Sequence, residues 1–144
     1  MAGTRSQYAV HLSAAPRLVW DRLQLAATWE TLGPVNRVWD AAHDAEGVLR
    51  SYRWSATVGP QRIEGTATTR TARPPEAFEL ELVASGITGV LSTHLAANRS
   101  GTLLTVGLQL RPTAWLSTAF FPFVSRAITD GLPAQVEDFA AGFG

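Results

Sequence analysis

Apolar and polar residues alternate along most of the chain from residue 6 to residue 111. In the clearest stretch Phe78, Leu80 and Leu82 are apolar, and the two residues between them are glutamates. A period of two is typical of a β-strand that buries one face. Turn residues separate the alternating segments at intervals of about ten residues, which favours antiparallel hairpins. The pattern predicts seven strands, at residues 6–12, 35–43, 48–58, 62–72, 78–82, 87–97 and 104–110.

Two short helices are predicted between the first and the second strand. Pro16 suits the first turn of the first helix, because an N–H at that position has no partner within the helix. Ser13 precedes it as a candidate N-cap. The second helix, at residues 26–32, carries Trp29 and ends at Gly33 and Pro34.

A spacing of three or four residues replaces the alternation after residue 113. It predicts one long C-terminal helix whose apolar face consists of Leu116, Phe120, Phe123, Val124, Ala127, Ile128, Leu132, Val136 and Phe139. Pro122 lies inside this pattern and must break or kink the helix, and Pro133 after Gly131 marks a second weak point. We expect the segment around Phe120 and Phe123 to form a hinged, mobile edge of a pocket mouth.

The composition fits one globular domain spanning residues 1–144 and narrows its chemistry. Twelve acidic residues balance twelve arginines, so no net charge attracts the protein to nucleic acid or to an anionic membrane. The absence of Cys excludes disulfides and thiolate chemistry, and the absence of Lys excludes a Schiff base on a side chain. No signal-like apolar run opens the sequence, and no window reaches the ~20 apolar residues of a membrane span. We therefore expect a cytoplasmic protein without a cofactor.

Four short stretches carry a resemblance to a known family. They are residues 11–23 (HLSAAPRLVWDRL), 74–80 (PPEAFEL), 100–105 (SGTLLT) and 131–133 (GLP). With the order of the elements, they resemble the SRPBCC or START-like superfamily, in its bacterial branch of polyketide cyclase/dehydrase and lipid-transport-like proteins. The resemblance covers essentially the whole chain. It implies an α+β helix-grip fold, in which a curved antiparallel sheet of about seven strands wraps around a long C-terminal helix.

The same resemblance implies a hydrophobic ligand. Members of that family enclose an apolar cavity between sheet and helix, and they bind lipids, sterols, polyketides, hormones or quinones there. A minority are cyclases, aromatases or hydrolases. The four stretches are structural motifs, and the family has no general catalytic signature to transfer to this chain.

Few titratable residues are candidates for chemistry. His11, His43 and His94 fall on separate strands without ligand spacing, so no metal site is expected. His43 lies beside Asp40 and Asp44, which is compatible with a His–carboxylate pair and also with local turn chemistry.

Arg50 shares a predicted strand face with Tyr52 and Trp54. A guanidinium inside an apolar cavity must pair with a carboxylate or with a polar group of a ligand. The alternative is that Arg50 extends to water at the rim of the sheet. If the protein is an enzyme, Arg50, Tyr52 and His43 are its candidate catalytic residues.

Three aromatic residues, Trp39, Tyr52 and Trp54, are candidates for a cavity lining. The inward residues of the neighbouring strand, Gly65 and Ala67, are small and leave room beside them. A fully packed core fits the same residues, so both interpretations stay open. The predicted ligand-binding set is Trp39, Arg50, Tyr52, Trp54, Phe120 and Phe123.

Three functions are compatible with these features. The first is binding or transport of a hydrophobic small molecule (lipid, polyketide or quinone-like) between the sheet and the C-terminal helix. The second is a polyketide cyclase/dehydrase-type enzyme, acting in the same cavity mainly by holding a reactive chain in a folded conformation. The third is an interaction or assembly module, monomeric or homodimeric, with an apolar surface around Trp115, Phe121 and Phe143.

Overall fold

The computed structural model describes residues 4–33, 35–58, 61–84, 86–112, 126 and 129–143. Seven antiparallel strands form one sheet in the order β1-β7-β6-β5-β4-β3-β2. Strands β2 to β7 are therefore neighbours in the sheet as they are in the sequence, and β7 closes the order by pairing with β1. The strands are β1 (Thr4–Leu12), β2 (Arg37–His43), β3 (Leu49–Val58), β4 (Gln61–Arg73), β5 (Ala77–Ala84), β6 (Ile87–Asn98) and β7 (Gly101–Pro112).

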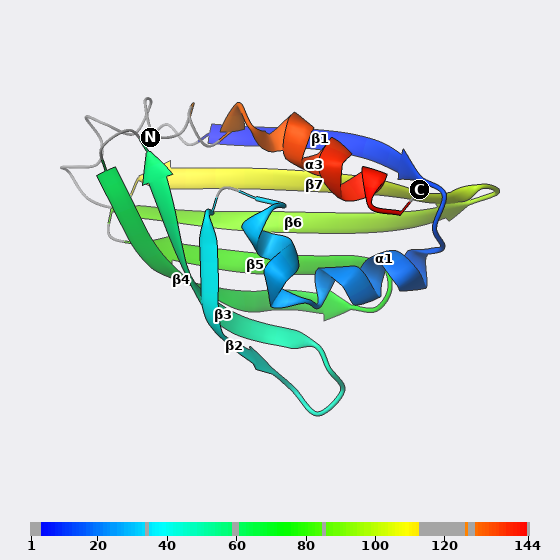
Figure 1. Ribbon diagram of the computed structural model, residues 1–144, viewed down its shortest axis with the longest axis horizontal. Coiled ribbons are helices and arrows are strands. Elements are labelled where there is room, and N and C mark those ends of the chain that lie inside the picture. Colours follow the sequence, from blue (N-terminus) through cyan, green and yellow to red (C-terminus); the bar gives the residue numbers. More distant parts are fainter. Residues whose placement is uncertain are drawn as a thin grey trace.

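Helices cover one face of this curved sheet, called the inner face below (Figure 1). Helix α1 (Pro16–Leu23) and the 3-10 helix η1 (Ala26–Glu30) follow β1, and helix α3 (Leu132–Ala141) is the last described element. Helix α3 packs along β1, α1 packs against β6 and β7, and η1 packs against β2. This arrangement confirms the predicted α+β helix-grip architecture, with two short helices after the first strand and a helix at the C-terminal end.

The core lies between the inner face and the helices. Every second residue of β7 from Thr102 to Leu110 is buried, as the alternation predicts. Phe78 on β5 joins the two layers, because its ring lies edge-on to Trp20 at 5.7 Å and 6.0 Å from Trp29, measured between ring centroids. Such aromatic contacts add to the free energy gained from burial alone. They fix α1 and η1 over the middle of the sheet.

The start of α1 differs in one detail from the prediction. Ala15, and not Ser13, is the N-cap residue, and no side chain caps the helix. Pro16 lies in the first turn, where it presents no N–H that needs a partner.

The C-terminal helix is interrupted near its end. The chain is helical at Arg126 and Thr129, turns at Asp130 and Gly131, and enters α3 at the next residue. The weak point predicted near Pro133 is therefore confirmed, with this proline in the first turn of α3. The predicted apolar face is also confirmed within α3, where the buried residues are Leu132, Val136 and Phe139.

The predicted hinge falls on a part of the chain that the structure does not describe. Residues 113–125 include Pro122 and the two predicted ligand contacts Phe120 and Phe123, which lie outside the described residues. Their proposed roles stay predictions.

Phe143, expected on an exposed apolar surface, is half-buried. Its ring lies edge-on to Phe139 at 5.2 Å between centroids, and the Arg22 guanidinium lies 4.8 Å from its centroid. Phe143 therefore connects the end of α3 to α1. Trp115 and Phe121, the other residues of that predicted surface, lie outside the described residues.

Two β-bulges interrupt the pairing of β2 with β3. Asp40 and Ala41 occupy the space opposite a single residue of β3, and Arg50 is an extra residue between the paired positions Ser51 and Leu49. Asp40 has a φ of 54°, a left-handed value that Asp tolerates better than most residues. Bulges bend a strand and redirect its side chains. The tip of the β2–β3 hairpin accordingly projects away from the rest of the sheet (Figure 1).

The bulge on β3 corrects the predicted position of Arg50. Strict alternation places Arg50 on the inner face with Tyr52, but the extra residue turns Leu49 into the core, where it is 0% exposed. Arg50 is left exposed at the rim. Of the two interpretations that the sequence leaves open, the rim position is therefore borne out, and the inward one fails because alternation alone cannot detect an inserted residue.

The predicted face of Trp39 is also wrong, here because of the register with which β2 pairs with β3. Trp39 pairs with the exposed Arg53, whereas its neighbour Val38 pairs with Trp54. Since directly paired residues share a face, Trp39 lies on the outer face of the sheet. There its ring lies 5.4 Å from the Arg37 guanidinium. It does not join Tyr52 and Trp54 in one lining.

Candidate functional site

Trp54 fills the room that the small residues of β4 leave on the inner face. Its indole lies directly over Gly65, where a Cβ would come within 2.5 Å of the Trp54 ring. Its Nε1–H donates a hydrogen bond to the carbonyl oxygen of Thr66 at 2.9 Å, so its polar group is satisfied. At this position the packed-core interpretation is the correct one.

Tyr52 differs from Trp54 because none of the described residues forms a hydrogen bond with its polar group. The side chain is 2% exposed, and its hydroxyl makes no hydrogen bond to any of the described residues. Burial raises the pKa of this phenol well above its ordinary value, so it stays protonated and can donate. A ligand oxygen on the inner face could accept its proton. Tyr52 is therefore the inner-face group best suited to orient a bound molecule.

A second candidate site is a cleft between α1 and the β2–β3 hairpin. Its volume is about 760 Å³, within the range of small-molecule sites. Helix α1 and the segment after it provide one wall, the hairpin provides the other, and the end of β4 closes the space between them. The lining residues are Arg17, Trp20, Asp21, Gln24, Leu25, His43, Asp44, Glu46, Gly47, Val48, Arg50, Ala72 and Pro74.

Gln24 links the two walls of this cleft. It follows the last residue of α1 and is 7% exposed. Its Oε1 accepts a hydrogen bond from the main-chain N–H of Leu49 at 2.9 Å. Because that bond directs the amide oxygen at Leu49, the NH₂ group points elsewhere, and the buried Nε2 has no partner among the described residues. This orphaned donor is the clearest sign of a missing polar partner near the cleft.

His43 forms the second link. Its Nε2 lies 2.8 Å from the main-chain carbonyl oxygen of Gln24. Since a carbonyl can only accept, Nε2 carries the proton, and in the neutral ring Nδ1 is left as an acceptor. The partner of His43 is thus a carbonyl, so of the two interpretations that the sequence leaves open, the structure does not bear out the pair with Asp40 or Asp44.

Charged groups of both signs surround the cleft. Arg17 pairs with Asp21, with 3.4 Å between Nε and Oδ1. Asp44 shapes the hairpin turn, because its Oδ1 accepts the main-chain N–H groups of Glu46 at 2.9 Å and Val48 at 3.0 Å. The site therefore has no strong excess of one charge.

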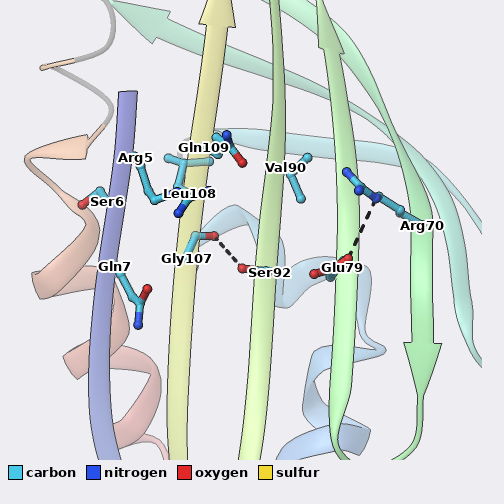
Figure 2. A pocket seen from close by; sticks show the side chains of 10 residues that line it. All are labelled: Arg5, Ser6, Gln7, Arg70, Glu79, Val90, Ser92, Gly107, Leu108 and Gln109. Atoms are coloured by element: carbon cyan, nitrogen blue, oxygen red, sulfur yellow. Dashed lines mark hydrogen bonds and ion pairs between the residues drawn. The ribbon is translucent and has the colours of Figure 1, made fainter. Parts of the chain in front are cut away.

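A third depression lies on the outer face of the sheet (Figure 2). Its volume is about 220 Å³, and Gly107 forms part of its floor beside Ser92. The carboxylate of Glu79 in its wall accepts a hydrogen bond from Thr71 at 3.1 Å and lies 3.9 Å from Arg70. This carboxylate already has partners, so the depression has fewer unused polar groups for a ligand than the other two sites have.

The structure therefore separates the residues that the sequence groups together. His43 and Arg50 line the cleft, Tyr52 lies on the inner face, and Trp39 lies on the outer face. Sequence reasoning missed Gln24. The available signal was its spacing of four residues from Trp20, which places a polar side chain on the buried face of α1.

Within the described ranges, no three His, Asp or Glu side chains are grouped closely enough to hold a metal ion. Nor does any described helix combine the length and apolar character needed to cross a membrane.

Comparisons with known proteins identify the fold. No protein-family model matches the chain, and no curated protein sequence matches it significantly. Three solved structures illustrate the likeness. A START superfamily protein from Mycobacterium smegmatis aligns with a TM-score of 0.62 and 12% identity, over 85% of this chain and 92% of the other. The Zhui aromatase/cyclase from Streptomyces sp. R1128 aligns with a TM-score of 0.63 and 13% identity, over 98% of this chain and 86% of the other. Norcoclaurine synthase from Thalictrum flavum, in complex with dopamine and hydroxybenzaldehyde, aligns with a TM-score of 0.65 and 11% identity, over 98% of this chain and 86% of the other. The chain thus has the START-like fold that its sequence motifs indicate, and identities this low show the fold alone.

Proposed function

We propose that this protein binds a hydrophobic small molecule between the inner face of the sheet and the C-terminal helix. The observation that carries the proposal is Tyr52, a buried phenol whose hydroxyl has no partner among the described residues. An apolar surface that presents a phenol as hydrogen-bond donor is suited to an apolar molecule that carries an accepting oxygen.

The ligand class follows from that donor. A carbonyl or ether oxygen would accept the proton of Tyr52, which favours a polyketide or a quinone-like molecule over a plain hydrocarbon chain. Two proteins of similar fold agree with this choice. One is named an aromatase/cyclase, and the other is described with dopamine and hydroxybenzaldehyde, which are oxygen-bearing aromatic molecules.

Binding without turnover is the function that the described residues support best. Cyclase chemistry needs acid and base groups that converge on the bound molecule. Of the three candidate catalytic residues, Tyr52 is on the inner face, whereas His43 and Arg50 line the separate cleft. The described part of the chain therefore offers no convergent acid–base set, and the cyclase/dehydrase alternative is supported only by the likeness of the fold to that of an aromatase/cyclase.

A titration with the anthraquinone emodin tests the proposal, with anthracene as the probe that lacks oxygen. We expect saturable binding of emodin, and Tyr52→Phe should weaken it about fivefold to tenfold, the effect of one lost hydrogen bond. Anthracene should bind the wild type and the variant equally. Absence of saturable emodin binding, or equal emodin affinity in both proteins, would argue against this role of Tyr52.

A further inference from the structure

We propose that the cleft between α1 and the β2–β3 hairpin is a second small-molecule site, specific for a flat, uncharged ring that carries a carbonyl next to an N–H, as in an aromatic lactam. This site is separate from the inner-face site and does not depend on the proposed function. The proposal rests on an unpaired donor, an available acceptor, an apolar wall and a fitting volume.

The donor is the amide nitrogen of Gln24. Its side chain is more than nine-tenths buried and lines the cleft, and its Nε2 is the buried atom that lacks a partner. The bond from Leu49 to Oε1 fixes which end of the amide remains unused. A ligand carbonyl is the group that would complete this hydrogen bond.

The acceptor is Nδ1 of His43. Because Nε2 donates to the carbonyl oxygen of Gln24, the neutral ring presents a lone pair at Nδ1. Both unused groups therefore belong to one junction, where Gln24 meets the hairpin. The proposed ligand would offer its C=O to Gln24 and its N–H to His43.

Trp20 supplies the apolar wall. It is 2% exposed, lines the cleft, and is held in place by its edge-on contact with Phe78. Val48 and Ala72, both half-buried, extend the apolar lining.

The charges of the cleft favour an uncharged ligand. Its lining contains two arginines and three acidic residues, and the pairing of Arg17 with Asp21 neutralises one of each. No single sign dominates, as it would in a site for phosphate or for a cation. The volume of about 760 Å³ admits a bicyclic ring.

The test uses carbostyril, a bicyclic aromatic lactam, and N-methylcarbostyril, which keeps the carbonyl but lacks the N–H. Binding to the full chain is followed in nitrogen–proton correlation spectra. We expect saturable binding of carbostyril, with shifts of the Gln24 side-chain amide and the Trp20 indole and none of the Trp54 indole. The N-methyl compound should bind about tenfold more weakly, because it leaves Nδ1 of His43 unpaired.

The variant His43→Phe should remove the difference between the two compounds. Its matched control is His94→Phe, which changes an exposed histidine on β6 and should preserve the difference. Three results would overturn the proposal. They are no saturable binding of carbostyril at millimolar concentration, equal affinity for both compounds in the wild type, and shifts that concentrate on Trp54 instead of Gln24 and Trp20. Because emodin and carbostyril are titrated separately, failure at one site is distinguishable from failure at the other.

Discussion

His43 donates the proton on its Nε2 to the main-chain carbonyl oxygen of Gln24 at 2.8 Å. The side-chain oxygen of Gln24 in turn accepts the N–H of Leu49 at 2.9 Å. One residue at the end of α1 therefore holds both strands of the β2–β3 hairpin, beside the bulge that exposes Arg50. These two contacts position the hairpin against α1 and so define the cleft.

Replacing Gln24 with Ala should destabilise the protein by about 2 kcal/mol, since the buried N–H of Leu49 loses its partner. Urea denaturation followed by tryptophan fluorescence measures this free energy of unfolding. The matched control is Gln7→Ala, because Gln7 is exposed on β1, and we expect a change within about 0.5 kcal/mol there. Equal stability of the two variants would show that Gln24 does not hold the hairpin.

Gly65→Ala should destabilise the protein by about 1–3 kcal/mol, the range for overpacking a filled core. The added Cβ would meet the Trp54 ring and the main-chain oxygen of Val83, and the main chain cannot easily move aside. Gly131→Ala is the control, because a Cβ there finds its nearest neighbour in the Gln135 side chain at 3.6 Å, an ordinary contact. Urea denaturation of both variants decides the point, and a stable Gly65→Ala protein would mean that Trp54 does not fill this space.

The two tryptophans of the hairpin strands should respond differently to replacement by Phe. Trp54→Phe removes the hydrogen bond to Thr66 and part of the packing over Gly65, so we expect a loss of about 2 kcal/mol. Trp39→Phe changes a half-buried outer-face residue and should cost at most about 0.5 kcal/mol. Thermal and urea unfolding give both values. A larger loss for Trp39 than for Trp54 would contradict the assignment of their faces.

The sequence was sufficient to predict the architecture because alternation and turn spacing are local properties. The alternation holds over long strands such as β7, where every second residue is buried. The faces of Trp39 and Arg50 were not predictable in this way. Arg50 is itself a bulge residue, and the face of Trp39 depends on the register with which β2 pairs with β3; a single stretch of sequence reveals neither.

The candidate sites were predicted in part for the same reason. The face of Tyr52 was predictable because β3 pairs regularly with β4 there, with Tyr52 opposite Ala67. Gln24 was missed because its importance arises from contacts with residues 19 and 25 positions away, His43 and Leu49. Only the folded chain shows that one end of its amide is used and the other is not.

The stability of the protein should fall as the pH rises above 10, because of its two tyrosines. Burial raises the pKa of Tyr52 above its ordinary value of 10.0. The pKa of Tyr8 is raised first by its hydrogen bond to Glu137 on α3, and then by desolvation and by the charge of that carboxylate. Between the unfolded and the folded pKa, the unfolded chain has released a proton that the folded chain still holds. The stabilisation is therefore complete below pH 10 and is lost progressively above it.

The chain has no lysine, so no lysine ionisation contributes to the change in stability above pH 10. The ultraviolet absorbance of tyrosinate follows the ionisation of Tyr8 and Tyr52. In the folded protein we expect the half-buried Tyr8 to ionise first, above pH 10, and Tyr52 to ionise only as the protein unfolds. Tyr8→Phe should remove the first step, and Tyr52→Phe should flatten the decline in the free energy of unfolding. If both tyrosines ionised together near pH 10 with the fold intact, Tyr52 would be in contact with water, and the inner-face site proposed around it would lose its support.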